Sequence, residues 1–260
     1  MRGGRERAVK LKLNRGHAHR DDVLGRIQAF WKASPPQIER RDDSTTRQRN
    51  WVVRLSTSPP VEDWALIVGD AIHNLRAALD HLVWQLVETN RKTPGRHNSF
   101  PIAEDESRFR SMVEQSLLGV DAPAAAAIQA IKPWKGESEA LWLLHQLDIQ
   151  DKHRLPLVAL ASNEAVSLDF GKMMEATFPA LGAVPSMRIG LRPSDRDVAD
   201  GTVLLSEKLD DPRTHKSGPE FHFEIDLNLP DGTRRPLGNV LAELASAADT
   251  TIGTLTPFLA

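Results

Sequence analysis

Apolar residues recur at helical spacing in six stretches of the chain. Residues 18–33 collect their large apolar side chains on one side, and the prolines that follow Ser34 end the pattern. The stretch from Trp64 to about Val87 has the longest apolar arc. Further helices are predicted over 105–118, over 122–132, from about Ser138 to Lys152, and over 237–259.

Strand-like patterns lie in two places. Residues 38–57 have β-branched ends around a polar "DDSTT" centre, which predicts a hairpin. After Pro156, Gly, Pro and Asp turns separate short strand-like stretches at 155–162, 165–170, 186–193, 202–209 and 221–229. The sequence therefore predicts an α+β protein with a helical core, an appended antiparallel β-sheet and a C-terminal helix. The expected division is a helical domain over 1–156, carrying the hairpin, and a β-rich region over 157–260 that ends in a helix; the two could also pack as one unit.

Composition narrows the class of protein. The chain has 260 residues, a formal net charge of −2 and no cysteine, so disulfides and thiolate metal sites are excluded. No run of about 18 apolar residues occurs, which predicts a soluble cytoplasmic protein without a membrane span. Basic residues crowd the first 54 positions. They could form a phosphate-attracting surface, or a frayed tail followed by ordinary exposed strand charges.

The polar side of the helix over residues 69–87 is unusual. It carries short-reach side chains that favour helix weakly, in place of the usual Glu and Lys: Asp70, His73, Asn74, Arg76, Asp80, His81 and Trp84. Two explanations stay open. The first is a polar seam buried between helices that only fixes packing. The second is a cleft that contains an acid–base histidine and a phosphate-binding arginine.

A second segment carries the same types of polar residue. In "LHQLDIQDKHR", His145, Asp148 and Lys152 share one helical side, and Asp151 lies beside them. If the two helices are neighbours, His73 or His81 could face His145 and Asp148. We therefore expect the two segments to form one shared site or one shared buried network.

Two kinds of hydrolytic chemistry fit these residues. Four of them could bind zinc or manganese, namely His73, His81, His145 and Asp148. Arg76 and Lys152 would repel such a cation, and no H-E-x-x-H or E-x-x-H pair is present. Metal-independent phosphodiester cleavage needs only a base, an acid and a cation. We therefore predict neither a metal nor another cofactor.

Three blocks of the chain resemble a family of uncharacterised bacterial and phage-associated proteins. The blocks are "GDAIHNLRAALDHLVWQLV", "FPIA" at 100–103 and "LHQLDIQDKHR", preceded by the basic segment "KLKLNRGHAHRDDVLGRIQAF". The resemblance covers roughly residues 8–156, and the family has no established activity.

At the level of a short motif, Arg76 followed by four residues and His81 resembles the Arg-x4-6-His signature of HEPN domains. The resemblance implies a helical bundle and a metal-independent endoribonuclease, assembled as a homodimer. Arg76 would stabilise the phosphorane and His81 would exchange the proton, with His73, Asn74 and Asp80 orienting them. RNA, a second copy and an antitoxin-like protein are the implied partners. A non-catalytic module and a metal-dependent hydrolase remain the alternatives.

Overall fold

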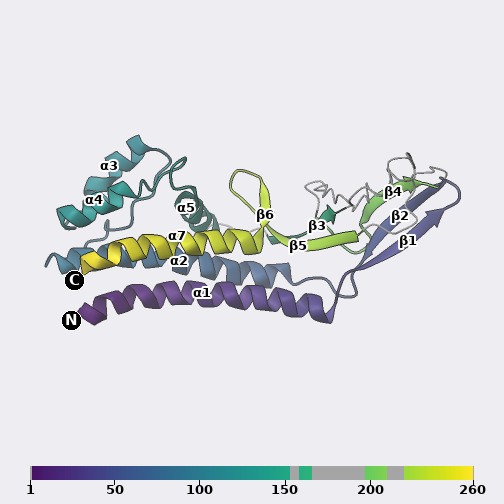
Figure 1. Cartoon of the computed structure of the whole chain (residues 1–260), viewed down its shortest axis with the longest axis horizontal. Coiled ribbons are helices and arrows are strands. Elements are labelled where there is room, and N and C mark those ends of the chain that lie inside the picture. The colour runs from purple at the N-terminus through teal and green to yellow at the C-terminus, as the bar shows by residue number, and fades with distance from the viewer. Residues whose placement is uncertain (1, 153–157, 166–196, 210–219, 260) are drawn as a thin grey trace, which may run out of the picture. The chain divides into compact units, whose positions relative to one another are not determined.

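The computed structural model describes residues 2–152, 158–165, 197–209 and 220–259 (Figure 1). The helices are α1 (Arg2–Ala33), α2 (Val61–Thr89), α3 (Glu106–Ser116), α4 (Ala122–Ala130), α5 (Glu139–Asp151) and α7 (Leu237–Leu255), and the 3₁₀ turn η2 (Thr256–Leu259) follows α7. The strands are β1 (Gln37–Asp43), β2 (Gln48–Arg54), β3 (Val158–Ala165), β4 (Val203–Lys208), β5 (Glu220–Asn228) and β6 (Arg234–Pro236). The predicted α+β class is confirmed.

Most predicted elements agree with the structure to within a few residues, but the first helix is longer than expected. It begins at Arg2, whereas the prediction placed its start near residue 18. Its N-terminal half has a narrow apolar stripe, in which Val9 and Leu13 are buried. A Cβ atom added to Gly16 would lie 2.8 Å from the Leu75 side chain, so α1 and α2 are in direct contact there. Such a narrow contact gives a weak periodic signal in the sequence.

The strands after Pro156 are described only in part. The stretch predicted over 155–162 contains the start of β3, and those predicted over 202–209 and 221–229 match β4 and β5. The stretch over 186–193, and all of 165–170 after its first residue, lie outside the described residues.

Two compact units make up the chain, and they cut across the expected boundary at residue 156. The first contains residues 1–26, 62–158 and 227–260, so the C-terminal helix belongs with the helical bundle. The second contains residues 27–61 and 159–226, and the hairpin belongs to it.

The helical unit is built around α2. Its apolar arc is fully buried, including Ile72, Leu75, Leu79 and Leu82. Acidic residues in the first turn of α2 suit the positive end of the helix dipole. Helix α7 packs on α2 and buries its own apolar face, with Leu241 and Leu244 at 0% exposure. Each fully buried leucine contributes about 2 kcal/mol of hydrophobic stabilisation, so α2 is a rigid platform for the polar residues on its other side.

The hairpin unit contains a three-stranded antiparallel sheet with the order β1-β2-β4. The β1–β2 register places Gln37 opposite Arg54 and Asp43 opposite Gln48. Arg49 pairs with Asp42 across the strands, and Arg54 pairs with Glu39. These arginines are therefore neutralised locally. A second sheet has the order β3-β5-β6.

None of the helices in the described part of the chain is long and apolar enough to cross a lipid bilayer.

Candidate functional site

Helices α2 and α5 bring the two polar segments together, as the sequence predicts if they are neighbours. His73 contacts Asp148, and three residues further along α2, Arg76 contacts His145, three residues earlier on α5. The two helices therefore run antiparallel along this seam. The seam has an open part around His73 and a closed part around Arg76.

The open part consists of His73, Asp148 and Lys152. The Asp148 side chain is only 4% exposed, and its Oδ1 lies 2.9 Å from Nδ1 of His73, whose side chain is 51% exposed. Lys152 donates from Nζ to the other oxygen, Oδ2, at 2.6 Å. An ionised carboxylate can only accept, so the neutral imidazole has its proton on Nδ1 and its lone pair on Nε2. Nε2 has no partner among the described residues and can act as a base.

The closed part consists of Arg76, Asp80 and the main chain of Phe100. Arg76 is 6% exposed, and its Nη1 donates to Asp80 Oδ1 at 2.7 Å while Nη2 donates to the Phe100 carbonyl at 2.8 Å. Asp80 Oδ1 also accepts from the Phe100 amide at 2.8 Å. The arginine and the aspartate thus hold both main-chain polar groups of the fully buried Phe100. This closed set of bonds fixes the 98–103 segment on α2.

His145 lies beside the closed part and is kept neutral there. Burial lowers its pKa to about 4, and the Arg76 charge acts in the same direction. Nδ1 of the neutral ring faces Arg76 Nε at 3.5 Å, at the upper limit of a hydrogen bond. His145 is therefore a weak acceptor for Arg76 at neutral pH, where it lacks the second ring proton that an imidazolium could give as an acid.

Asp151 packs against Gly69 on the other side of the open part. A Cβ atom at position 69 would overlap the Asp151 carboxylate, so any other residue there requires that this side chain shifts. Burial raises the pKa of Asp151, and the neighbouring charge of Asp148 raises it further.

Asn74 and His81 lie outside both parts. Asn74 donates to the Asp70 carbonyl at 2.8 Å and accepts from Lys12 Nζ at 3.4 Å, so it connects α2 to α1. His81 is exposed, and within the described residues it makes no hydrogen bond or ion pair. Positions 76 and 81 are about 140° apart around a helix axis. The structure therefore does not bring Arg76 and His81 together within one chain.

The four residues considered for metal binding do not converge on one point. No group of three or more His, Asp or Glu side chains that could hold a metal ion occurs among the described residues. The Lys152 ammonium occupies the second oxygen of Asp148, and the Arg76 guanidinium faces the ring nitrogen of His145. Positive charges thus stand where a cation would have to bind.

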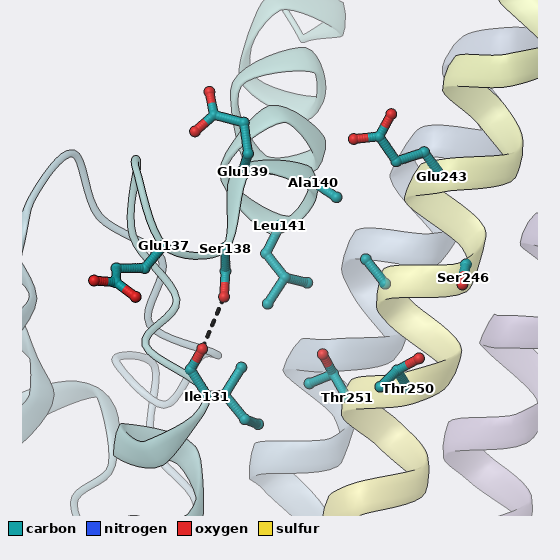
Figure 2. Close-up of a pocket in the computed structure, with 11 residues that line it drawn as sticks. Ile131, Glu137, Ser138, Glu139, Ala140, Leu141, Glu243, Ser246, Thr250 and Thr251 are labelled. Atoms are coloured by element: carbon teal, nitrogen blue, oxygen red, sulfur yellow. Dashed lines mark hydrogen bonds between the residues drawn. The ribbon is translucent and has the colours of Figure 1, made fainter.

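The structure also has a cavity that the sequence did not predict. It has a volume of about 440 Å³ and lies between the start of α5 and α7. Glu139 and Glu243 lie on opposite sides of it in Figure 2, and the Ser138 hydroxyl donates to the Ile131 carbonyl. No predicted site residue lines this cavity. Carboxylates at its edge disfavour a phosphate there.

Sequence reasoning missed the Phe100 main chain as a part of the seam, and it missed the contacts that Gly69 and Lys12 make beside the seam. The only signal for Gly69 was a glycine inside a helix, where glycine costs about 1 kcal/mol relative to alanine. No family model, no curated protein and no solved structure matches the chain. The predicted resemblances therefore stay predictions, and the function has to be argued from the geometry of the seam.

Proposed function

We propose that this chain is a metal-independent endoribonuclease in which His73 is the base, Asp148 orients it and Lys152 supplies the cation. One observation carries the proposal: a nearly buried carboxylate, Asp148, holds an imidazole that is half exposed. A histidine fixed through Nδ1, whose Nε2 has no partner among the described residues, suits proton abstraction from a bound substrate.

RNA is favoured because the open part contains a base and a cation but no nucleophile. His73 is not hydrogen-bonded to any Ser or Thr hydroxyl among the described residues, and the chain has no cysteine. RNA brings its own nucleophile, the 2′-hydroxyl next to each phosphodiester. The protein then needs only to remove a proton and stabilise negative charge.

The reaction follows from this arrangement. Nε2 of His73 takes the proton of the 2′-hydroxyl, and the oxygen forms a bond to phosphorus while the bond from phosphorus to the 5′-oxygen breaks. The Lys152 ammonium stabilises the charge on the phosphoryl oxygens, and the leaving oxygen takes a proton from water. The products are a 2′,3′-cyclic phosphate and a 5′-hydroxyl end.

This proposal keeps the reaction expected from the HEPN resemblance but assigns it to other residues. Arg76 is buried and bonded to Asp80 and Phe100, so its guanidinium is not presented to a phosphate. A homodimer, an antitoxin-like partner and a cytoplasmic location remain predictions.

The test compares two exposed histidines of the same helix. An unstructured RNA oligonucleotide is incubated with the full chain, with and without a chelator, and the product ends are identified by mass spectrometry. His73→Ala should reduce cleavage at least 100-fold, whereas His81→Ala should leave it unchanged. A DNA oligonucleotide of the same sequence should stay intact because it has no 2′-hydroxyl.

The reverse result would refute the assignment. Loss of cleavage in His81→Ala, with full activity in His73→Ala, would return the chemistry to the Arg-x4-His motif. Cleavage that stops with the chelator would favour the metal-dependent alternative, and absence of cleavage with every RNA tried would reject the ribonuclease.

The second candidate, a structural polar network, is favoured for the closed part by a specific observation. All three nitrogens of the Arg76 guanidinium donate to groups of the protein, namely Asp80, the Phe100 carbonyl and His145. If the open part also served only to stabilise the fold, His73→Ala would lower the free energy of unfolding and would leave RNA cleavage unchanged.

A further inference from the structure

We infer that Trp84 is a base-stacking platform for the same RNA strand that His73 cleaves. The inference rests on the proposed function for the nature of the ligand. Trp84 belongs to α2 and is 43% exposed, which is unusual for the largest apolar side chain. Because neighbouring side chains enclose the backbone in the middle of a helix, most of this exposed area belongs to the ring.

A hydrogen bond to a buried loop residue holds the Trp84 ring in place. Its Nε1 donates to the Asn98 carbonyl at 3.1 Å. Asn98 is itself buried, accepts from the Gly95 amide at 2.7 Å, and donates to the carbonyls of Ser116 and Leu118. A ring fixed in this way loses little conformational entropy when a base stacks on it.

Trp84 and His73 lie on one line along α2. Eleven residues separate them, which corresponds to three turns plus about 20°, or about 16 Å along the axis. Ala77 and Asp80 lie between them on opposite sides of this line, and the Phe100 main chain lies on the Asp80 side. A strand stacked on Trp84 would therefore pass over the small side chain of Ala77 on its way to His73.

The charges near this line fit a phosphate backbone. Lys12 reaches Asn74 from α1 and Lys152 binds Asp148, so two ammonium groups flank the His73 end. The carboxylate of Asp80, between the two ends, is neutralised by Arg76. Stacking platforms beside such cations are the usual way to bind single strands, since every base has a π-face.

The test measures binding apart from cleavage, in a His73→Ala background that leaves the probe intact. The probe is a fluorescent oligouridylate, compared with an oligonucleotide of equal length and charge that carries abasic riboses. Trp84→Ala should weaken oligouridylate binding about tenfold, and Trp84→Phe, which keeps a ring, should retain most of it. Leu11→Ala is the control because Leu11 is an exposed apolar residue of α1.

The abasic probe shows whether stacking is responsible. It should bind the Trp84 protein about tenfold more weakly than oligouridylate, and the Trp84→Ala protein should bind both probes equally. If the Trp84 protein and the Trp84→Ala protein bound oligouridylate equally, Trp84 would not be a stacking platform. The proposed cleavage site at His73 could still be correct. Trp84-dependent binding without cleavage by the wild-type chain would reject the acid–base assignment alone. Self-association that depends on Trp84, without RNA binding, would assign the ring to a protein interface and overturn the inference.

Discussion

One turn of α2 separates His73 from Arg76, and the surroundings of the two side chains differ. Arg76 is 6% exposed and bonded to groups that are all part of the protein. The His73 side chain is 51% exposed, and within the described part of the chain one of its ring nitrogens, Nδ1, has a partner and the other has none. Both residues belong to the same polar stripe of the sequence and both contact α5.

This difference shows how one polar stripe can serve two purposes. A buried cation needs partners for all its donors, because an unpaired buried charge costs several kcal/mol. Arg76 finds these partners in the Asp80 carboxylate and the Phe100 carbonyl. In the open part the buried group is the Asp148 carboxylate. Its two partners, His73 and Lys152, are each about half exposed. Nε2 of His73 has no partner among the residues that the structure describes, and the proposed function gives this atom the role of the base.

The largest effect should come from breaking the closed part. Arg76→Ala leaves the Phe100 carbonyl without its donor and the Asp80 carboxylate without its cation, although Asp80 still accepts from the Phe100 amide, and it should lower the free energy of unfolding by about 3 kcal/mol. The measurement is urea denaturation followed by circular dichroism. Asp80→Asn should cost less, because the amide oxygen can still accept from Arg76 and Phe100.

An opposite pattern would contradict the division between the two parts. If Arg76→Ala unfolded at the wild-type urea concentration and had lost only RNA cleavage, Arg76 would be a catalytic residue. The motif with His81 would then be the better explanation.

The sequence predicted the elements of the seam well. The apolar arc of α2 is long and regular, so its helix and its buried side were readable, and "LHQLDIQDKHR" had the spacing of α5. The division between open and closed could not be read, because it depends on the Phe100 main chain, which reaches α2 through the loop after Thr89. A main-chain carbonyl leaves no mark in a residue pattern.

Arg76 and His81 fit a signature by spacing alone, and spacing does not report burial. The contact that distinguishes Arg76 is its i, i+4 pair with Asp80. A carboxylate four residues after an arginine in a helix therefore indicates that the arginine is paired within the protein.

A smaller loss of stability is expected in the open part. Asp148→Asn keeps an acceptor for His73 but turns an amide toward Lys152, and it should lower the free energy of unfolding by about 2 kcal/mol. Cleavage should fall at least tenfold, because the imidazole loses the carboxylate that orients it. Lys132→Met is the control for stability, since Lys132 and its partner Glu137 are both exposed and the loss of their ion pair should cost about 0.5 kcal/mol. A loss in Asp148→Asn as large as in Arg76→Ala would mean that both parts are structural.

His145 makes the closed part sensitive to acid. Its pKa is lowered from 6.5 to about 4, so between these values the unfolded chain binds the proton more readily than the folded chain does. Stability from this group is complete above pH 6.5 and is lost as the pH falls toward 4. His145→Gln should remove about 1–2 kcal/mol of that loss, measured as unfolding free energy at pH 7 and pH 4.5. An unchanged difference between the two pH values would show that other groups cause the acid sensitivity.

The smallest effect concerns the contact that borders the open part. Gly69→Ala gains about 1 kcal/mol of helix propensity, but its Cβ atom meets the Asp151 carboxylate. The single variant should therefore be slightly less stable than the wild type. In an Asp151→Ala background the obstruction is gone, and Gly69→Ala should then stabilise the protein by about 1 kcal/mol. Additive effects in this double-mutant cycle would show that Asp151 does not need the space over Gly69. Non-additive effects would show that the Asp151 carboxylate needs the space over Gly69. Asp151 also lies near Asp148, so this contact between α2 and α5 borders the open part.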